Sequence, residues 1–191
     1  MGKRMVMRPF EQRAQTIIRR LPPHALAAEI GVLRGQVSEC VLQNTDASLI
    51  MVDSWLPSDQ QPERYKATKD QHAFDPAEIV SKHKREALAR VHRFRGRAQI
   101  KEMSSVEAAS QVEDCTLDLV FIDADHSYEG VREDIAAWFP KVKASGWIGG
   151  HDYQNPDARF CFGVDRAVDG WIEETGCTLE TDLNFTWWAR V

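Results

Sequence analysis

The sequence predicts an α/β fold in which helices cover both faces of a doubly wound sheet. Two observations lead to this prediction. Apolar runs of strand length alternate with helical patterns of apolar residues, and three of the runs stop abruptly at polar residues, Asp53, Asp123 and His151. The chain also has 191 residues, of which 43% are hydrophobic, so it can form a single domain with a sizeable core.

The first 53 residues contain two predicted helices and two predicted strands. Apolar residues recur at helical spacing over residues 13–21, and two prolines follow and end that helix. Continuous apolar runs predict strands over residues 26–30 and 49–52. Between these strands, the apolar spacing that starts at Val37 predicts a second helix.

Residues 54–74 are polar and irregular, which is typical of a lid or substrate loop. A helix is predicted to follow: Asp75 can cap it, Pro76 suits its first turn and Glu78 can reach back to the cap. The predicted inner face of this helix consists of Ile79, Val80, His83, Ala87 and Val91. The histidines that we expect at the surface or on helix faces are His24, His72, His83 and His92.

The second half of the chain continues the alternation. Its predicted strands span residues 98–101, 117–122, 147–150 and 185–191, the last with the alternating pattern of a half-buried strand. A helical stripe from Val131 to Val142 comes before Gly146, which punctuates the pattern. A second stripe from Val164 to Ile172 predicts a helix that Gly176 closes.

Composition narrows the classes of partner. The formal net charge is −5, so we expect neither nucleic acid nor an anionic membrane as a partner, and we interpret the basic residues between 82 and 97 as a solvated helix face. No apolar run reaches membrane-spanning length. The four cysteines form no CxxC pair, so we expect no zinc site and interpret them as reduced thiols of a cytoplasmic protein.

The stretch "AEIGVLRGQVSE" has the features of a ligand-binding turn. Glu29 is next to last in the predicted strand, Gly31 permits a tight turn, and Gly35 lets the chain approach a ligand closely. The dinucleotide pattern GxGxxG is absent, and a plain strand–helix turn explains the glycines equally well. Asp53, at the end of the next strand, can accept both hydroxyls of a ribose or serve as a turn residue.

Two further strands end in polar clusters, within "VFIDADHSYEGVREDI" and "GWIGGHDY". The polar residues at these ends are Asp123, Asp125, His126, His151 and Asp152. Clustered carboxylates repel one another unless a cation or a shared proton relieves them, and oxygen ligands suit Mg²⁺, Ca²⁺ or Mn²⁺. Helix capping by Asp125 or Ser127 is the simpler interpretation, but it does not explain the second cluster.

The motifs "EIGVLRG", "VDSW", "DLVFIDADHSYEGVREDI", "GWIGGHDY" and "FGVDRAVDGWIEETG" together resemble the class I S-adenosylmethionine-dependent methyltransferases. They are most similar to the small O-methyltransferase-like branch that includes antibiotic-sugar methyltransferases. The resemblance covers residues 27–191 and implies a Rossmann-like, mostly parallel seven-stranded sheet. We expect a single domain over residues 1–191, with residues 1–22 as an N-terminal helical extension and 54–74 as the lid or substrate loop.

The resemblance implies roles for individual residues. Those that would bind the cofactor are Glu29, Gly31, Gly35, Asp53, Ser104, Ser105 and Asp123. Glu29 and the glycines would hold its methionine end, Asp53 its ribose, and the two serines would lie near its adenine. Those that would hold Mg²⁺ or another divalent cation are Asp123, Asp125, His151 and Asp152. Those that would take part in catalysis are Asp123, His126 and His151, although His151 stands where related enzymes carry an acidic residue.

These observations predict a methyltransferase that acts on an oxygen of a small molecule. Either a divalent cation or an acid–base group would help the acceptor hydroxyl group to lose its proton. Its partner would be a small methyl acceptor, and a homodimer is compatible with the sequence. One rival hypothesis is a metal-dependent oxygenase or hydrolase that uses His126, His151 and a nearby aspartate. The others are an NAD-dependent oxidoreductase, disfavoured by the incomplete glycine pattern, and a non-catalytic nucleoside-binding module.

Overall fold

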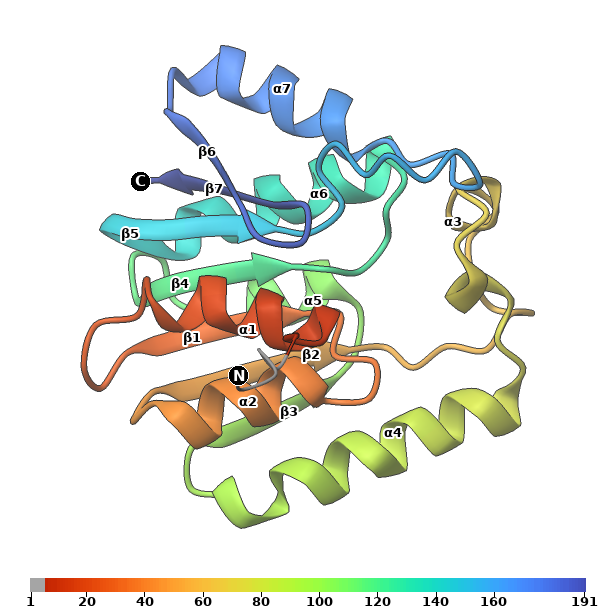
Figure 1. Ribbon diagram of the computed structural model, residues 1–191, viewed down its shortest axis with the longest axis horizontal. Coiled ribbons are helices and arrows are strands. Elements are labelled where there is room, and N and C mark those ends of the chain that lie inside the picture. Colours follow the sequence, from red (N-terminus) through yellow and green to blue (C-terminus); the bar gives the residue numbers. More distant parts are fainter. Residues whose placement is uncertain (1–5) are drawn as a thin grey trace, which may run out of the picture.

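The computed structural model describes residues 6–191, which form a seven-stranded sheet with helices on both faces (Figure 1). The strands are β1 (Leu26–Ile30), β2 (Ser48–Asp53), β3 (Ala98–Glu102), β4 (Leu117–Ile122), β5 (Val142–Gly150), β6 (Leu179–Asp182) and β7 (Thr186–Arg190). Their order across the sheet is β3-β2-β1-β4-β5-β7-β6. Only β7 pairs in the antiparallel sense, with β5 and β6. The predicted fold class is therefore confirmed.

The helices form two layers. They are α1 (Pro9–Ile18), α2 (Gln36–Asn44), α3 (Glu63–Ala67), α4 (Ala77–Val91), α5 (Ser105–Ser110), α6 (Tyr128–Trp138) and α7 (Val164–Thr175), with short 3₁₀ turns η1 (Gln71–Phe74), η2 (His92–Phe94) and η3 (Phe139–Lys141). Successive strand residues point to opposite faces, so Ala27 joins the core under α1, α2 and α4, while Ala28 and Ile30 join the core under α5, α6 and α7. Both faces of the sheet are thus covered.

The central strands match the prediction most closely. β1 and β4 have the predicted bounds, and α7 ends at Gly176, whose φ of 71° is the left-handed conformation expected of a closing glycine. The sequence missed α5 and β6, which are too short to show a clear apolar period. The lid segment (residues 54–74) is not irregular throughout, because it contains α3 and η1.

The predicted helical stripe that ended at Val142 is wrong at its end. α6 stops at Trp138, because Pro140 follows it and cannot continue a helix. Val142 instead opens β5, which runs through Gly146 rather than starting after it. The strand continues because its register against β4 shifts, with Ser145 at a φ of 67°.

The first helix lies earlier than predicted. Pro9 occupies its first turn, and the backbone N–H of Arg8 donates to the Glu11 carboxylate at 2.7 Å, which fixes the start. The helix ends at Ile18, so Leu21 lies beyond it. Residues 1–5 of the predicted N-terminal extension lie outside the described residues, and the proposed division of the chain stays a prediction.

The start of α4 also differs from the prediction. Pro76 occupies the N-cap position and no side chain caps the helix. Asp75 turns away, and its carboxylate lies 2.9 Å from Nδ1 of His72. Of the predicted inner face, only Ile79 is exposed, at 38%, and His83 is buried, as its place on that face predicts.

β7 is more deeply buried than its alternating pattern suggested. Residues Thr186–Ala189 are all buried, because the strand lies between β5 and β6 and has a core on each side. Trp187 packs into the core under α7, whereas Trp188 packs into the core under α1 and α2. No helix among residues 6–191 is both long enough and apolar enough to cross a membrane.

Candidate functional site

A cavity of about 920 Å³ lies beyond the carboxyl ends of the central parallel strands. Parallel α/β sheets bind ligands at this edge. The residues that line the cavity from the strand ends include Glu29, Asp53, Asp123 and His151, and those from the lid segment include Tyr65 and Asp70. Figure 1 shows the lid segment around α3 beside the loop after β5, and Cys161 of that loop donates its N–H to the carbonyl of Thr68 at 2.8 Å.

The two predicted glycines differ in what they approach. Gly31 has a φ of +88°, and a Cβ there would overlap the backbone carbonyl of Asp123, so the glycine lets the ends of β1 and β4 pack closely. Gly35 has a φ of +70°, and its missing side chain would meet Ala87 of α4 at 3.0 Å. Gly35 therefore serves helix packing and does not line the cavity.

Asp53 holds the glycine turn in place. Its carboxylate accepts the backbone N–H groups of Val32 at 2.9 Å, Leu33 at 2.8 Å and Trp55 at 2.8 Å. Burial raises the pKa of Asp53, although these three donors partly offset that effect. A carboxylate has about four acceptor positions, so roughly one stays available to a ligand in the cavity.

Glu29 is a buried carboxyl group on the cavity wall, with 3% of its surface exposed. The hydroxyl of Ser38 donates to it at 2.5 Å. Burial raises the pKa of Glu29 to about 8, and the bond from Ser38 lowers it only in part. No cation of residues 6–191 forms an ion pair with Glu29, so a positively charged ligand would supply the partner that this carboxylate lacks.

The two serines after β3 also line the cavity, and both have structural partners. Ser104 is the N-cap of α5 and accepts the N–H of Glu107 at 3.3 Å. The hydroxyl of Ser105 accepts the indole N–H of Trp138 at 2.9 Å. Ser104 and Ser105 thus form a fixed polar part of the wall beside β2 and β3.

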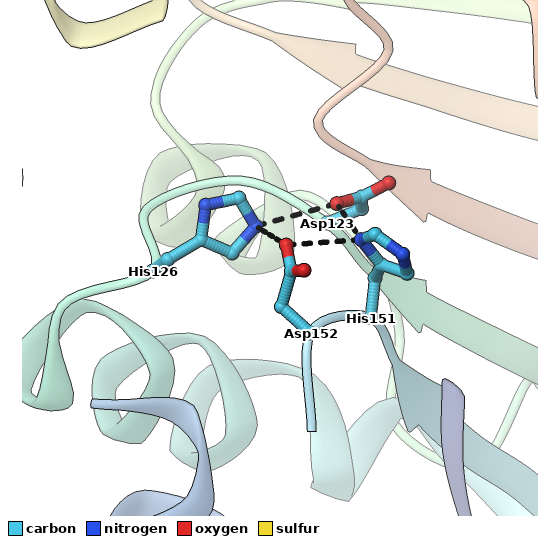
Figure 2. A group of neighbouring side chains, drawn as sticks. All are labelled: Asp123, His126, His151 and Asp152. Carbon is cyan, nitrogen blue, oxygen red and sulfur yellow. Dashed lines mark hydrogen bonds and ion pairs between the residues drawn. The ribbon is translucent and has the colours of Figure 1, made fainter. Parts of the chain in front are cut away.

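Four residues from the ends of β4 and β5 form one compact group, the strand-end cluster: Asp123, His126, His151 and Asp152. Figure 2 shows the two carboxylates between the two imidazoles. Nε2 of His126 lies 3.3 Å from Oδ1 of Asp123 and 3.1 Å from Oδ2 of Asp152. Nδ1 of His151 lies 3.3 Å and 3.0 Å from the same two oxygens. Each carboxylate is therefore shared by both rings.

The charges in the strand-end cluster support one another. Burial opposes a charged His126, but its hydrogen bonds with Asp123 and Asp70 outweigh burial and raise its pKa well above the usual value. The pKa of His151 is raised in the same way, against burial, by the charge of Asp123. Burial alone would raise the pKa of Asp123 and Asp152, yet the imidazoles lower it for both. His126 is thus held as a cation between carboxylates, and Nδ1 of His151 faces two of the same carboxylates.

Two residues from distant segments complete this network, and the sequence analysis missed both. Arg13 of α1 brings Nη1 to 3.3 Å from Nε2 of His151, and its Nε lies 3.5 Å from Oδ2 of Asp123. Asp70 of the lid segment lies 2.9 Å from Nδ1 of His126. Neither had a recognisable signal, because Arg13 reads as the polar side of a helix and Asp70 as one residue of a polar loop.

Asp125, predicted as a metal ligand, does not join the cluster. Its carboxylate accepts the N–H of Ser127 at 2.9 Å and contacts Nε of Arg64 at 3.1 Å. Ser127 caps α6 by accepting the N–H of Gly130 at 3.0 Å. The capping interpretation of Asp125 and Ser127 therefore describes this turn, whereas Asp123 and His126 belong to the strand-end cluster (Figure 2).

The strand-end cluster has the spacing that a divalent cation needs. Its four ligand atoms lie within 4.8 Å of one another, and adjacent ligands of an ion with bonds of about 2.1 Å are roughly 3 Å apart. Two nitrogens and two oxygens suit zinc, manganese or iron better than magnesium. Arg13 opposes an added cation, and the cluster is also satisfied without one through its own ion pairs.

Comparisons with known proteins agree with the fold. A family model described as a methyltransferase domain matches residues 28–153. A proposed O-methyltransferase from Klebsiella pneumoniae is 16% identical, with a TM-score of 0.63 over 100% of this chain and 83% of that one. A proposed caffeoyl-CoA O-methyltransferase from Staphylococcus aureus is also 16% identical, with a TM-score of 0.62 over 97% and 84%. No curated protein sequence matches the chain.

Proposed function

The chain belongs to the family of methyltransferase domains, and on that premise we propose that it transfers a methyl group from S-adenosylmethionine to an oxygen of a small molecule. One observation carries the proposal. The buried acids of β1 and β2 and the strand-end cluster line the same cavity, whose volume of about 920 Å³ can hold a cofactor with a small acceptor. The acceptor would be a sugar or another compound with a free hydroxyl group.

The residues at one end of the cavity fit the cofactor. The cofactor supplies an activated methyl group on a sulfonium, and it also carries an ammonium group. Glu29, which has no cationic partner among residues 6–191, would face this positive methionine end. Asp53 would use its free acceptor position for the ribose, while Ser104 lies on the wall where the adenine would stack.

The strand-end cluster would prepare the acceptor. A hydroxyl group must lose its proton before or as its oxygen attacks the methyl carbon, and the products are then a methyl ether, S-adenosylhomocysteine and that proton. The pKa of His126 is raised well above its usual value, so this ring stays protonated, and the proton would pass to His151 or to a carboxylate of the cluster. The imidazolium ring of His126 would stabilise the negative charge that develops on the oxygen.

A divalent cation is the second way in which this cluster could work. Asp123, His126, His151 and Asp152 would hold it, and the cation would lower the pKa of a coordinated hydroxyl group. The nitrogen ligands favour Mn²⁺ or Zn²⁺ over the Mg²⁺ expected from the sequence. The acid–base and metal alternatives use the same residues and differ in whether a chelator abolishes activity.

In methyl transfer the protein contributes mainly by positioning the reactants. Alignment of donor and acceptor can lower the activation barrier by about 7–11 kcal/mol. The lid segment and the loop after β5 would align the acceptor. The ring centroid of Phe162 lies 4.6 Å from that of His126 and 4.6 Å from that of Phe160, on which it stacks. The two phenylalanines line the cavity together with Tyr65. An acceptor with an apolar face beside its hydroxyl group would fit this wall.

Calorimetric titration with S-adenosylhomocysteine, with and without Mn²⁺ or Mg²⁺, tests the cofactor. We expect binding that Asp53→Ala weakens, with Asp46→Ala, an exposed aspartate away from the cavity, as the matched control. Release of S-adenosylhomocysteine in the presence of a panel of sugars, phenols and hydroxy acids then tests transfer. No binding under any condition would overturn the proposal. Binding without any turnover would favour a nucleoside-binding module, and stoichiometric iron would favour an oxygenase.

A further inference from the structure

A second group of histidines and a carboxylate lies on another wall of the cavity. This lid-base cluster consists of His72 in η1, Asp75 just before α4, and His83 in α4. Nδ1 of His72 lies 2.9 Å from Oδ2 of Asp75, and Nδ1 of His83 lies 3.7 Å from the same oxygen. The two imidazole rings are perpendicular, with centroids 5.9 Å apart. The cluster thus joins the end of the lid segment to α4.

His83 has unmet hydrogen-bonding capacity. Only 2% of its surface is exposed, and neither ring nitrogen has a hydrogen-bond partner. The 3.7 Å separation from Asp75 is too long for a hydrogen bond. A buried polar group without a partner costs about 1–3 kcal/mol, so such groups are rare unless something else satisfies them. One ring nitrogen of His83 lies within 4.8 Å of a ligand atom of each of the two other members of the cluster.

We propose that His72, Asp75 and His83 bind a transition-metal ion of the Zn²⁺ class. Two imidazole nitrogens and one carboxylate oxygen are a common ligand set for zinc with an open fourth position. In a tetrahedral shell with bonds of 2.0–2.1 Å, ligand atoms are about 3.4 Å apart. The distances from Asp75 to His72 and His83, 2.9 and 3.7 Å, bracket that value, and all three ligand atoms lie within 4.8 Å of one another.

The surroundings of the lid-base cluster agree with metal binding. A metal ion would supply the partner that the buried ring of His83 lacks. Asp75 supplies the negative charge and is itself only 20% exposed. The expectation of no zinc site considered cysteine ligands alone, and it does not extend to this site.

The ion would act as a clip. It would fix the last turn of the lid segment against α4, and thereby the wall that runs from His72 to Trp55. Its open position would face the cavity, where water or a ligand oxygen could complete the shell. The site is separate from the strand-end cluster and shares no residue with it, so the proposal stands independently of methyl transfer.

Zinc and cobalt titrations of chelator-treated, full-length protein test the proposal. Tetrahedral Co²⁺ gives a visible absorption band, so it reports both binding and geometry. We expect wild type to bind one equivalent of metal at this site. His72→Asn should weaken the affinity for that equivalent by tenfold or more. His92→Asn, which alters an exposed histidine at the end of α4, should bind as wild type does. Ions held at the strand-end cluster would bind all three proteins alike and would cancel in this comparison.

A second variant guards against misfolding. His83→Leu should also lose this equivalent while keeping a cooperative unfolding transition, and Zn²⁺ should raise the Tm of wild type by more than that of either variant. The lid segment of wild type should also become more resistant to limited proteolysis when Zn²⁺ is added. Equal Zn²⁺ stoichiometry and affinity in wild type, His72→Asn and His83→Leu would overturn the proposal, as would the absence of any Zn²⁺ binding to wild type.

Discussion

The strand-end cluster and the lid-base cluster contain the same residue types and line the same cavity, yet they differ in how far their polar atoms are satisfied. In the strand-end cluster, His126 contacts Asp70, Asp123 and Asp152 within 3.3 Å. In the lid-base cluster, His83 is equally buried and its nearest carboxylate oxygen is 3.7 Å away. One group forms a closed network of ion pairs, while the other leaves a partner missing.

The difference follows from the elements that carry each cluster. The ends of two adjacent parallel strands converge, so β4 and β5 deliver their aspartates and histidines to one point. Helix α1 and the lid segment then add Arg13 and Asp70. The lid-base cluster has only a short 3₁₀ turn and one helix face to supply ligands. The strand-end cluster therefore has partners for its polar atoms within the protein, whereas the lid-base cluster is preformed for an external ligand.

Removal of His126 should show the largest effect. His126→Leu would leave Asp70, Asp123 and Asp152 buried without their shared cation, and breaking a buried pair costs about 3–5 kcal/mol. We expect the free energy of unfolding in urea to fall by that amount and methyl transfer to be lost. His24→Leu, an exposed histidine, is the control. A His126→Leu protein as stable as wild type would mean that the network is not a coupled unit.

Asp70 tests whether the network also closes the lid. Its carboxylate contacts Nδ1 of His126 and accepts the hydroxyl of Tyr65 at 3.2 Å. Asp70→Asn keeps the shape but removes the charge, and a hydrogen bond to a charged group contributes about 1.5–3 kcal/mol. We expect a loss of stability in that range and faster proteolysis within the lid segment. Asp59→Asn, at an exposed position of the same segment, should change neither.

The sequence predicted the site correctly where the position of a residue at the end of a strand is enough to place it on the cavity. Glu29, Asp53 and Asp123 stand at the last residues of apolar runs or just after them, and the carboxyl ends of parallel strands meet at one edge, so all three lie on the cavity. It was not informative for Arg13 and Asp70, which reach the site from segments far away in the chain. Their role depends on how α1 and the lid pack.

Neighbouring residues in a turn also proved hard to separate from the sequence. Asp123 and Asp125 are two positions apart in one polar run, yet the first enters the cluster and the second binds Arg64 and the start of α6. His83 was correctly expected on the inner face of its helix, but the absence of a hydrogen-bond partner follows from what packs against it. The local sequence pattern predicts whether a side chain is buried, but tertiary packing decides whether its polar atoms find hydrogen-bond partners.

Glu29 is an intermediate case, since it has a hydrogen bond from Ser38 but no ion pair. Its pKa of about 8 means that it is mostly protonated at pH 7 and mostly ionised at pH 9. A cationic ligand needs the ionised form, so affinity for S-adenosylmethionine should rise about tenfold from pH 7 to pH 9 and level off above it, equivalent to about 1.4 kcal/mol.

Calorimetry in two buffers of different ionisation enthalpy checks the pH dependence of Glu29. Near pH 7, binding of S-adenosylmethionine should release close to one proton, and above pH 9 it should release almost none. Glu29→Gln should bind more weakly and lose this proton release, while Ser38→Ala should shift the profile to higher pH, because the Ser38 bond lowers the pKa. Proton release that is unchanged in Glu29→Gln would assign it to another group.

His83→Leu should show the smallest effect and the opposite sign to His126→Leu. Leucine fills a similar volume without the two unpaired ring nitrogens, so in metal-free protein the variant should be more stable by about 1 kcal/mol. Urea unfolding in the presence of a chelator measures this, with His92→Leu as an exposed control within about 0.5 kcal/mol of wild type. Saturating Zn²⁺ should reverse the order, since only wild type gains the binding free energy of the lid-base cluster. The same substitution would then destabilise a closed network and stabilise an incomplete one.

If His83→Leu instead destabilised the metal-free protein as strongly as His126→Leu, His83 would have partners that its surroundings do not show, and the contrast between the two clusters would fail.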